Sequence, residues 1–334
     1  MKKILILGSE GYLGSVLVPY LLSKNKNIVG VDTCYFGINN TKKSKNFKLI
    51  KKDYSKLEKN FFSQFQIIID LVNISNDPAS ELNKKFTNRI NYYNKIKLYN
   101  KIKSYKNLKK YIYISSCSVY GNNSSLINEK SKPKPISLYS KLCFKYENYL
   151  KNKKKIKFTI LRLGTLYGWS KRMRYDIAIN KILRDIIFLK KVEILGGKQS
   201  RFFCYNKFAC EVIKIIILDK KNKFLNKVYN IGIFNTNILQ LTKKILEIIK
   251  MKNISILHEE HNIDRRSYKV SLSSSKKFVK KSFNFEKFVN NSIINTFKKI
   301  KKDKSPFNNK KITLSVYSDL LKNKKIWFHF INTH

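Results

Sequence analysis

The first stretch of the chain contains the feature that most restricts how it can fold. The apolar run Ile4-Leu5-Ile6-Leu7 has the length and continuity of a strand buried in a parallel sheet. It runs directly into three evenly spaced glycines, Gly8, Gly11 and Gly14, and then into an amphipathic stretch that continues to Leu22. A glycine turn between a strand and a helix lets bare backbone approach a phosphate, which then lies at the positive end of the helix. The pattern predicts a dinucleotide-binding unit.

A carboxylate follows the second apolar run. Ile28-Val29-Gly30-Val31 ends in Asp32, near the separation from the glycine turn at which dinucleotide folds place an acid on the ribose hydroxyls. A carboxylate there repels a 2′-phosphate, so the sequence favours NAD over NADP. A plain strand-helix-strand unit with a surface aspartate is the alternative interpretation of the same residues.

Apolar runs alternate with helical segments through the first half of the chain. We expect further strands at 47–50, 67–72 and 111–114, and helices within 82–106. Glycine, acidic and hydroxyl residues follow these strands, at the edge where a doubly wound parallel sheet binds its ligands. The sequence therefore predicts an α/β fold with a Rossmann-type sheet.

Composition limits the other classes of function. The formal charge is +49, but the lysines are spread along the chain among Asn and Ile. This favours a solvated basic surface over a specific nucleic-acid site, and a basic nucleic-acid binder stays as a third hypothesis. The five cysteines form no CxxC pair, so we expect neither a disulfide framework nor a metal site. No apolar stretch is long enough to span a bilayer, so a cytoplasmic protein without a membrane partner is expected.

Short motifs occur over most of the chain in the order of one known enzyme family. Besides the glycine turn and Asp32, they are Asp53, Leu71 to Pro78, Asn91, Ser115 to Gly121, Ser137 to Tyr139, Leu161 to Gly168, Arg172 to Asp176, Tyr229 to Gly232 and Asp264 to Tyr268. The chain resembles an extended short-chain dehydrogenase/reductase of the NAD-dependent epimerase/dehydratase family, which acts on nucleotide-linked sugars.

The resemblance implies roles for particular residues. Tyr139 would be the catalytic base, and Ser116 would hydrogen-bond the reacting sugar oxygen. A phenol works as a base near neutral pH only if its pKa is lowered. The cofactor-binding residues implied for NAD are Gly8, Gly11, Tyr12, Leu13, Gly14, Asp32, Asp53, Tyr54, Leu71 and Tyr139. The residues implied for the diphosphate of a nucleotide-sugar substrate are Asn180, Arg201 and Arg266.

One position departs from the family in a way that bears on catalysis. The family has a lysine four residues after the tyrosine, where it lowers the phenol pKa, but this chain has Cys143, and Glu147 keeps the rest of the frame. Lys141 and Lys145 should point away, because a two-residue step rotates roughly 200° around a helix. A catalytically impaired homologue that binds NAD and nucleotide sugar is therefore the alternative to an active enzyme.

A second departure concerns the type of reaction. The family's dehydratases carry an Asp-Glu pair directly after the catalytic hydroxyl residue, where this chain has Cys117-Ser118. We therefore expect epimerisation, or a related oxidation of a sugar hydroxyl, rather than loss of water.

The expected organisation has two units. Residues 1–168 should form the NAD-binding Rossmann domain, and residues 169–321 mainly a substrate-binding lobe, with some segments able to return to the sheet. The stretch 238–249 has the periodicity of an amphipathic helix in this lobe. Residues 322–334 are expected to form a tail. A homodimer is one assembly open to such a chain.

Overall fold

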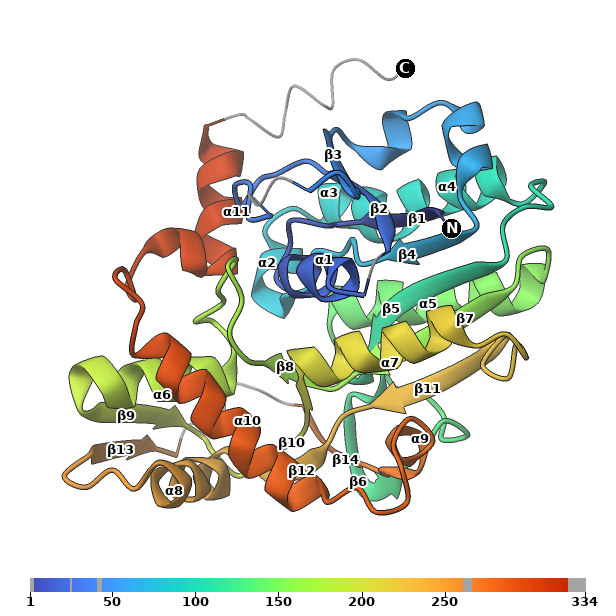
Figure 1. Ribbon diagram of the computed structural model, residues 1–334. Coiled ribbons are helices and arrows are strands. Elements are labelled where there is room, and N and C mark those ends of the chain that lie inside the picture. Colours follow the sequence, from blue (N-terminus) through green and yellow to red (C-terminus); the bar gives the residue numbers. More distant parts are fainter. Residues whose placement is uncertain (1–2, 25, 41–43, 261–265, 324–334) are drawn as a thin grey trace.

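A parallel sheet of seven strands is the centre of the computed structural model, which describes residues 3–24, 26–40, 44–260 and 266–323 (Figure 1). The motif residues Asp264 and Arg265 and most of the expected tail lie outside the described residues. Across the sheet the strand order is β11 (Lys227–Ile231), β7 (Phe158–Leu163), β5 (Lys110–Ser116), β4 (Ile67–Asp70), β1 (Lys3–Leu7), β2 (Asn27–Asp32) and β3 (Phe47–Lys51). Every neighbouring pair is parallel. The predicted Rossmann-type fold is confirmed.

Helices cover both faces of this sheet, which explains the unbroken apolar runs of its strands. On one face α1 (Gly14–Leu22) and α7 (Asn206–Leu218) pack against each other, and on the other lie α4 (Asn94–Ile102) and α5 (Leu138–Lys153) (Figure 1). In β1, Ile4 and Ile6 join the core under α1 and α7, while Leu5 and Leu7 join the core under α4 and α5. Both sets of side chains are therefore buried.

In this domain one predicted strand ends early and the predicted helical stretch is divided. The strand predicted for 67–72 ends at Asp70, because the Asp70 carboxylate accepts a hydrogen bond from the Val72 N–H (3.0 Å) and turns the chain. The helical stretch predicted within 82–106 is divided into three parts. The remaining short elements are η1 (Tyr54–Lys56), η2 (Lys59–Gln64), α2 (Asp77–Glu81), α3 (Lys84–Asn88), the π-helical turn η3 (Arg89–Tyr93) and η4 (Cys117–Tyr120).

Smaller sheets and three long helices build the second lobe. Its helices are α6 (Ala178–Leu189), α8 (Ile238–Ile249), which matches the predicted helix, and α10 (Phe285–Ile300). Its small sheets are β12 (Phe234–Asn237), β10 (Ser200–Tyr205) and β8 (Thr165–Tyr167); β13 (Ser255–Glu259) and β9 (Lys191–Leu195); and β14 (Ser267–Val270) and β6 (Asn122–Ile127). The shorter helices are α9 (Ser273–Lys276) and η5 (Asn309–Lys311).

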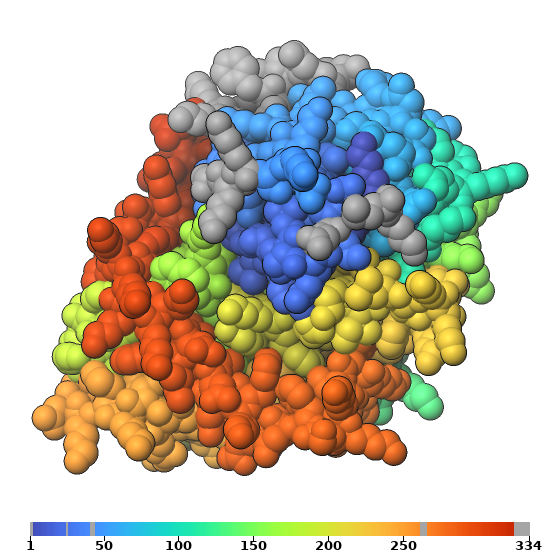
Figure 2. Space-filling view, viewed as in Figure 1, coloured from blue at the N-terminus to red at the C-terminus, as the bar shows by residue number. Residues whose placement is uncertain are grey.

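Three segments of the second half of the chain return to the Rossmann domain. Helix α7 packs on α1, β11 completes the sheet beside β7, and α11 (Thr313–Lys322) packs on α2. The space-filling view shows the C-terminal segment running along one side of the molecule from the second lobe to the Rossmann domain (Figure 2). In α11, Tyr317 packs edge-on against Phe36 of the loop after β2, with ring centroids 5.4 Å apart. We propose to keep the division at residue 168, with α7, β11 and α11 assigned to the first unit and β6 and β8 to the small sheets of the second.

No helix of the described part of the chain is long and apolar enough to cross a membrane.

The close approach of α1 to the turn before it predicts a strong effect at Gly14. A Cβ on Gly14 would lie 2.6 Å from the carbonyl oxygen of Ser9 and closer still to that of Gly8, whereas a Cβ on Gly11 would meet only the Gly8 oxygen, at 3.4 Å. Gly14→Ala should lower the free energy of unfolding by about 1–3 kcal/mol, the usual cost of overpacking, although alanine favours helices. Gly11→Ala is the matched control and should change it by less than about 1 kcal/mol. Urea denaturation measures both, and equal values would contradict the packing argument.

Candidate active site

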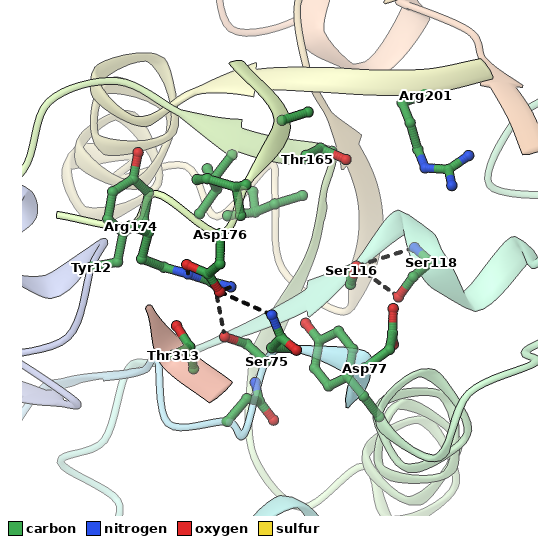
Figure 3. A pocket seen from close by; sticks show the side chains of 18 of the residues that line it. Tyr12, Ser75, Asp77, Ser116, Ser118, Thr165, Arg174, Asp176, Arg201 and Thr313 are labelled. Atoms are coloured by element: carbon green, nitrogen blue, oxygen red, sulfur yellow. Dashed lines mark hydrogen bonds and ion pairs between the residues drawn. The ribbon is translucent and has the colours of Figure 1, made fainter. Parts of the chain in front are cut away.

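A cavity of about 640 Å³ lies where the strands of the large sheet end, between the Rossmann domain and the second lobe (Figure 3). Its size is typical of small-molecule sites, which occupy roughly 300–1,000 Å³. The predicted site residues that line it are Gly8, Gly11, Tyr12, Leu13, Gly14, Leu71, Ser116, Tyr139, Arg201 and Arg266. The structure therefore brings together one predicted set from the Rossmann domain and another from the second lobe. The predicted residues that do not line this cavity are Asp32, Asp53, Tyr54, Cys143 and Asn180.

The glycine turn leaves room for a phosphate at the start of α1. Gly8 has a φ of +80°, which glycine adopts without strain, and its N–H donates to the Val31 carbonyl (2.9 Å). The space beside Gly11 is open, because a Cβ there would make one ordinary contact. The turn lies directly before α1, and the positive end of a helix dipole favours a negative charge at that place. These residues fit the pyrophosphate of a dinucleotide.

Asp32 is held at the end of β2 by two backbone N–H groups. Its carboxylate accepts hydrogen bonds from Cys34 (2.7 Å) and Glu10 (2.9 Å). Burial raises the pKa of Asp32, and these two bonds oppose that rise. Glu10, which the sequence analysis missed, is itself buried and accepts hydrogen bonds from the backbone N–H groups of Asn39 and Asn40. It orders the loop after β2, and no local pattern indicated this because its partners are distant in sequence.

Three other predicted residues are engaged inside the protein. Asp53 accepts a hydrogen bond from the Ser55 N–H (2.9 Å) and starts η1, and Tyr54 is buried in the core under α4 and α5. Asn180 is fully buried. Its amide accepts a bond from the Gly168 N–H (3.0 Å) and donates to the Tyr12 hydroxyl (3.0 Å). In this structure Asn180 thus joins the glycine turn to the second lobe.

Ser116 and Tyr139 lie together at the wall of the cavity. Ser116 ends β5, and Tyr139 lies in the first turn of α5, which Ser137 caps. The Ser116 hydroxyl oxygen accepts hydrogen bonds from the N–H (3.1 Å) and the hydroxyl (2.9 Å) of Ser118. Both of its accepting positions are used, so its own proton can be donated to Tyr139 or to a ligand in the cavity. Ser118 was not among the predicted site residues.

The Tyr139 phenol has a strongly shifted acidity. Burial, and then the neighbouring Cys143, raise the pKa of Tyr139 well above its usual value, and a hydrogen bond from Ser116 lowers it only in part. Burial also raises the pKa of the Cys143 thiol to about 12, so this thiol is neutral at pH 7. Lys141 and Lys145 are exposed on α5, as expected. Helix α5 therefore supplies no positive charge beside Tyr139.

A buried ion pair lies behind Cys143, on the face of the sheet covered by α5. Lys95 Nζ of α4 lies 2.8 Å from Asp70 Oδ2 and 2.6 Å from the Val72 carbonyl oxygen. It also lies 5.0 Å from the centre of the Tyr113 ring, and Tyr113 is paired with Asp70 across β4 and β5. The negative charge of the Asp70 carboxylate balances the positive charge of this ammonium. Lys95 therefore does not replace the missing lysine. Sequence reasoning missed the pair because its members are far apart in the chain.

The arginines predicted for the substrate lie at the mouth formed by the second lobe. Arg266 makes an ion pair with Asp77 at the start of α2, and Asp77 also accepts a hydrogen bond from the Ser137 hydroxyl. Arg201 donates to the carbonyl oxygens of Ser200 (2.8 Å) and Arg266. The Arg266–Asp77 pair bridges the two lobes and holds one guanidinium at the cavity wall.

Opposite Ser116 and Ser118, a second arginine–carboxylate pair faces the cavity (Figure 3). Arg174 makes a bidentate contact with Asp176 (3.1 and 2.7 Å), and Asn76 donates a hydrogen bond to the same carboxylate (2.9 Å). Burial alone would raise the pKa of Asp176, but the Arg174 charge outweighs it and holds the pKa at about 2. Asp176 is therefore ionised throughout the working pH range.

The site contains no evident metal centre. Within residues 3–24, 26–40, 44–260 and 266–323, no group of three or more His, Cys, Asp or Glu side chains could hold a metal ion.

Comparison with known proteins identifies the family. The model of the NAD dependent epimerase/dehydratase family matches residues 4–232. The chain belongs to this family of enzymes, and NAD is the cofactor by which the family is defined.

Two curated relatives illustrate the range of the family. An uncharacterized UDP-glucose epimerase of Bacillus subtilis is 26% identical over 69% of this chain and 76% of its own length. A dTDP-D-glucose 4,6-dehydratase of Dictyostelium discoideum is 30% identical over 74% of this chain, which spans 62% of that enzyme.

Solved structures share the fold over nearly their full length. The UDP-glucuronic acid 4-epimerase of Bacillus cereus, in complex with UDP-glucuronic acid and NAD, is 23% identical, with a TM-score of 0.76 over 90% of this chain and 99% of that one. The UDP-N-acetylglucosamine 4-epimerase of Methanobrevibacter ruminantium M1 is 24% identical, with a TM-score of 0.77 over 89% of this chain and 97% of that one.

The position of Asp32 predicts cofactor preference. The starting protein should bind NAD much more tightly than NADP, because a 2′-phosphate would be repelled by the carboxylate. Asp32→Ala should reduce this preference. Asp53→Ala is the control, because it removes another carboxylate that follows a strand of the sheet and should change the affinities for both cofactors alike. Isothermal titration calorimetry with NAD and NADP gives the ratio, and equal affinities in the starting protein would contradict the role of Asp32.

Proposed function

We propose that this protein is an NAD-dependent nucleotide-sugar epimerase that oxidises a sugar hydroxyl, with Tyr139 as the base. Ser116 orients the reacting oxygen, and Arg201 and Arg266 hold the diphosphate of the substrate. One observation carries the proposal. Tyr139 and Ser116 line the same cavity as the glycine turn on one side and the two arginines on the other. A ligand that spans this cavity would place its reacting carbon between the cofactor site and the phenol.

The residues present suit removal of a proton from an alcohol. Bound NAD would supply a hydride acceptor, and Leu71, directly after β4, is among the residues that would hold it. Ser116 has its own proton available, because its oxygen already accepts two hydrogen bonds, so it can hydrogen-bond the sugar oxygen and fix its distance from Tyr139. Tyr139 would accept the hydroxyl proton as hydride leaves the same carbon, and would return that proton to the oxygen once hydride has come back to the opposite face of the carbonyl carbon.

The cations of the cavity match an anionic substrate. Arginine binds phosphate oxygens through paired, charge-assisted hydrogen bonds, and both Arg201 and Arg266 line the cavity. UDP-sugars are bound by the epimerases whose fold this chain shares. A nucleoside-diphosphate sugar is therefore the substrate class that we assign.

The surroundings of Ser116 favour epimerisation over dehydration. Cys117 is fully buried, and its thiol donates to the Arg162 carbonyl oxygen (3.2 Å), away from the cavity. Ser118 is bonded to Ser116. The carboxylates of Asp77 and Asp176 are each paired with an arginine, which disfavours either as a proton donor for loss of water.

Loss of the phenol oxygen should separate chemistry from binding. Tyr139→Phe should lower turnover by at least about 100-fold, the lower range for general acid–base groups, with NAD affinity nearly unchanged. The measurement is conversion of a panel of UDP- and dTDP-sugars in the presence of NAD, followed by NMR, with calorimetry for NAD. Ser116→Ala should have a smaller effect. If the Phe variant keeps substantial activity, another group must act as the base.

The Cys143 position predicts the pH dependence. A base works when deprotonated, so a Tyr139 pKa raised above its usual value should make activity rise through the alkaline range. Cys143→Lys would place a cation one turn away and lower the phenol pKa by roughly one to three units. The lower limb of the pH–rate profile should move to lower pH by that amount.

Cys143→Met is the matched control for this change, because it adds length without charge. If no substrate is turned over, tyrosinate absorbance with NAD bound reports the same shift. A protein that turns over nucleotide sugars near neutral pH, and is no faster with lysine, would show that a group outside α5 tunes Tyr139. Binding of NAD and nucleotide sugar without turnover in any variant would favour the impaired homologue.

A further inference from the structure

Arg172 is a buried cation without a carboxylate partner among the described residues. Its side chain donates to the Thr313 hydroxyl (3.0 Å) and to the Met173 carbonyl oxygen (3.4 Å), both of them neutral acceptors, and the residue is only 4% exposed. Arg174, two residues further on, differs because Asp176 pairs with it in a bidentate contact. Arg172 lines the cavity, so a ligand can reach it.

A buried guanidinium without a counter-ion is unfavourable, because it loses hydration that no negative charge replaces. Burial, followed by the positive charge of Arg174, lowers the pKa of Arg172 to about 10. The cation therefore remains charged at neutral pH in a place that disfavours its charge. The Asp176 carboxylate attracts this guanidinium from a distance, but it is engaged in the bidentate contact with Arg174. The anion that would complete the arrangement by direct contact is therefore one that a ligand brings.

The location of Arg172 indicates which ligand would bring this anion. Its backbone N–H donates to the Ser15 hydroxyl (3.4 Å) in the first turn of α1, directly beyond the glycine turn. Its guanidinium stacks on Phe36, 3.8 Å from the ring centre, in the loop that follows Asp32. The side chain thus lies between the helix end that suits a phosphate and the loop beside the ribose carboxylate.

We propose that Arg172 binds the pyrophosphate of the cofactor, reaching it from the second lobe while the glycine turn approaches from the Rossmann domain. The inference rests on the NAD site of the proposed function. A planar guanidinium can make two parallel hydrogen bonds to phosphate oxygens. Stacking on Phe36 and the bond to Thr313 fix its plane, so little side-chain freedom is lost on binding.

Other residues would bind the diphosphate of the substrate. Arg201 stands at one side of the cavity and Thr313, to which Arg172 is bonded, at the opposite side (Figure 3). The two anionic groups would then occupy separate ends, each with its own arginine. Because Thr313 begins α11 and Tyr317 of α11 packs on Phe36, cofactor binding would also be coupled to the docking of this helix.

Arg172→Met tests the proposal by removing the charge and keeping most of the side-chain volume. The affinities for NAD and ADP, measured by calorimetry, should fall by roughly tenfold to hundredfold, the range for a lost hydrogen bond to a charged group. Adenosine, which has no phosphate, should bind equally well to both proteins. The midpoint of thermal unfolding without ligand should stay the same or rise, whereas an arginine with a merely structural role would lower it on removal.

Arg184→Met is the matched control. Arg184 also stacks on an aromatic ring, 5.1 Å from the centre of Phe307, but it is paired with Asp185 and lies outside the cavity. This variant should bind NAD with unchanged affinity. Arg172→Lys keeps the charge without the paired donors, so its affinity for NAD should be intermediate. If the Met variant does not fold, the Lys variant is used for the test.

Three results would overturn the inference. The first is an unchanged affinity for NAD and ADP in Arg172→Met, and the second is an equal loss for adenosine. The third is a loss of affinity for UDP with NAD binding intact, which would place Arg172 at the substrate and leave the proposed function standing. If the starting protein bound no NAD at all, the cofactor site of the proposed function would fail together with the inference.

Discussion

The active-site arrangement depends on buried hydrogen bonds that join the glycine turn to the second lobe. The Tyr12 hydroxyl donates to the Gly168 carbonyl oxygen (2.6 Å) and accepts from the Asn180 amide (3.0 Å), and the hydroxyls of Ser15 and Ser170 lie 2.6 Å apart. These groups are buried, so breaking the bonds would leave polar atoms unsatisfied inside the protein. They hold the two lobes at the distance that defines the cavity.

The charged groups inside the cavity are held in place by specific partners, unlike most of the charge of the chain. The +49 formal charge is spread over a solvated surface, where salt screens it. In the cavity, Arg174 and Arg266 are positioned by Asp176 and Asp77, while Arg172 is positioned by stacking and neutral hydrogen bonds. Two of these guanidinium groups are thus ordered by carboxylates, and the third is ordered without one and keeps its charge for an anionic ligand.

Helix α5 shows how a residue that departs from the family can change a site without changing the fold. Glu147, four residues after Cys143, still pairs with Arg162 of β7 in the core, with Arg162 Nε 3.0 Å from a carboxylate oxygen. This pair anchors the helix to the sheet at a position other than residue 143. What changes is local electrostatics: Tyr139 has a neutral thiol beside it, and the ammonium of Lys95 is neutralised by Asp70.

The sequence by itself determined the Rossmann-type sheet and several cavity residues, because periodicity, glycine spacing and strand ends are local properties that neighbouring residues express directly. The turn at Gly8 and the positions of Ser116 and Tyr139 follow from such patterns. Only the tertiary structure decided which charged side chains are paired and which are not. The partners of Glu10 and Lys95 are distant in the chain, and the isolation of Arg172 is a property of its surroundings. Burial and pairing depend on how separate elements pack, and no local pattern encodes that.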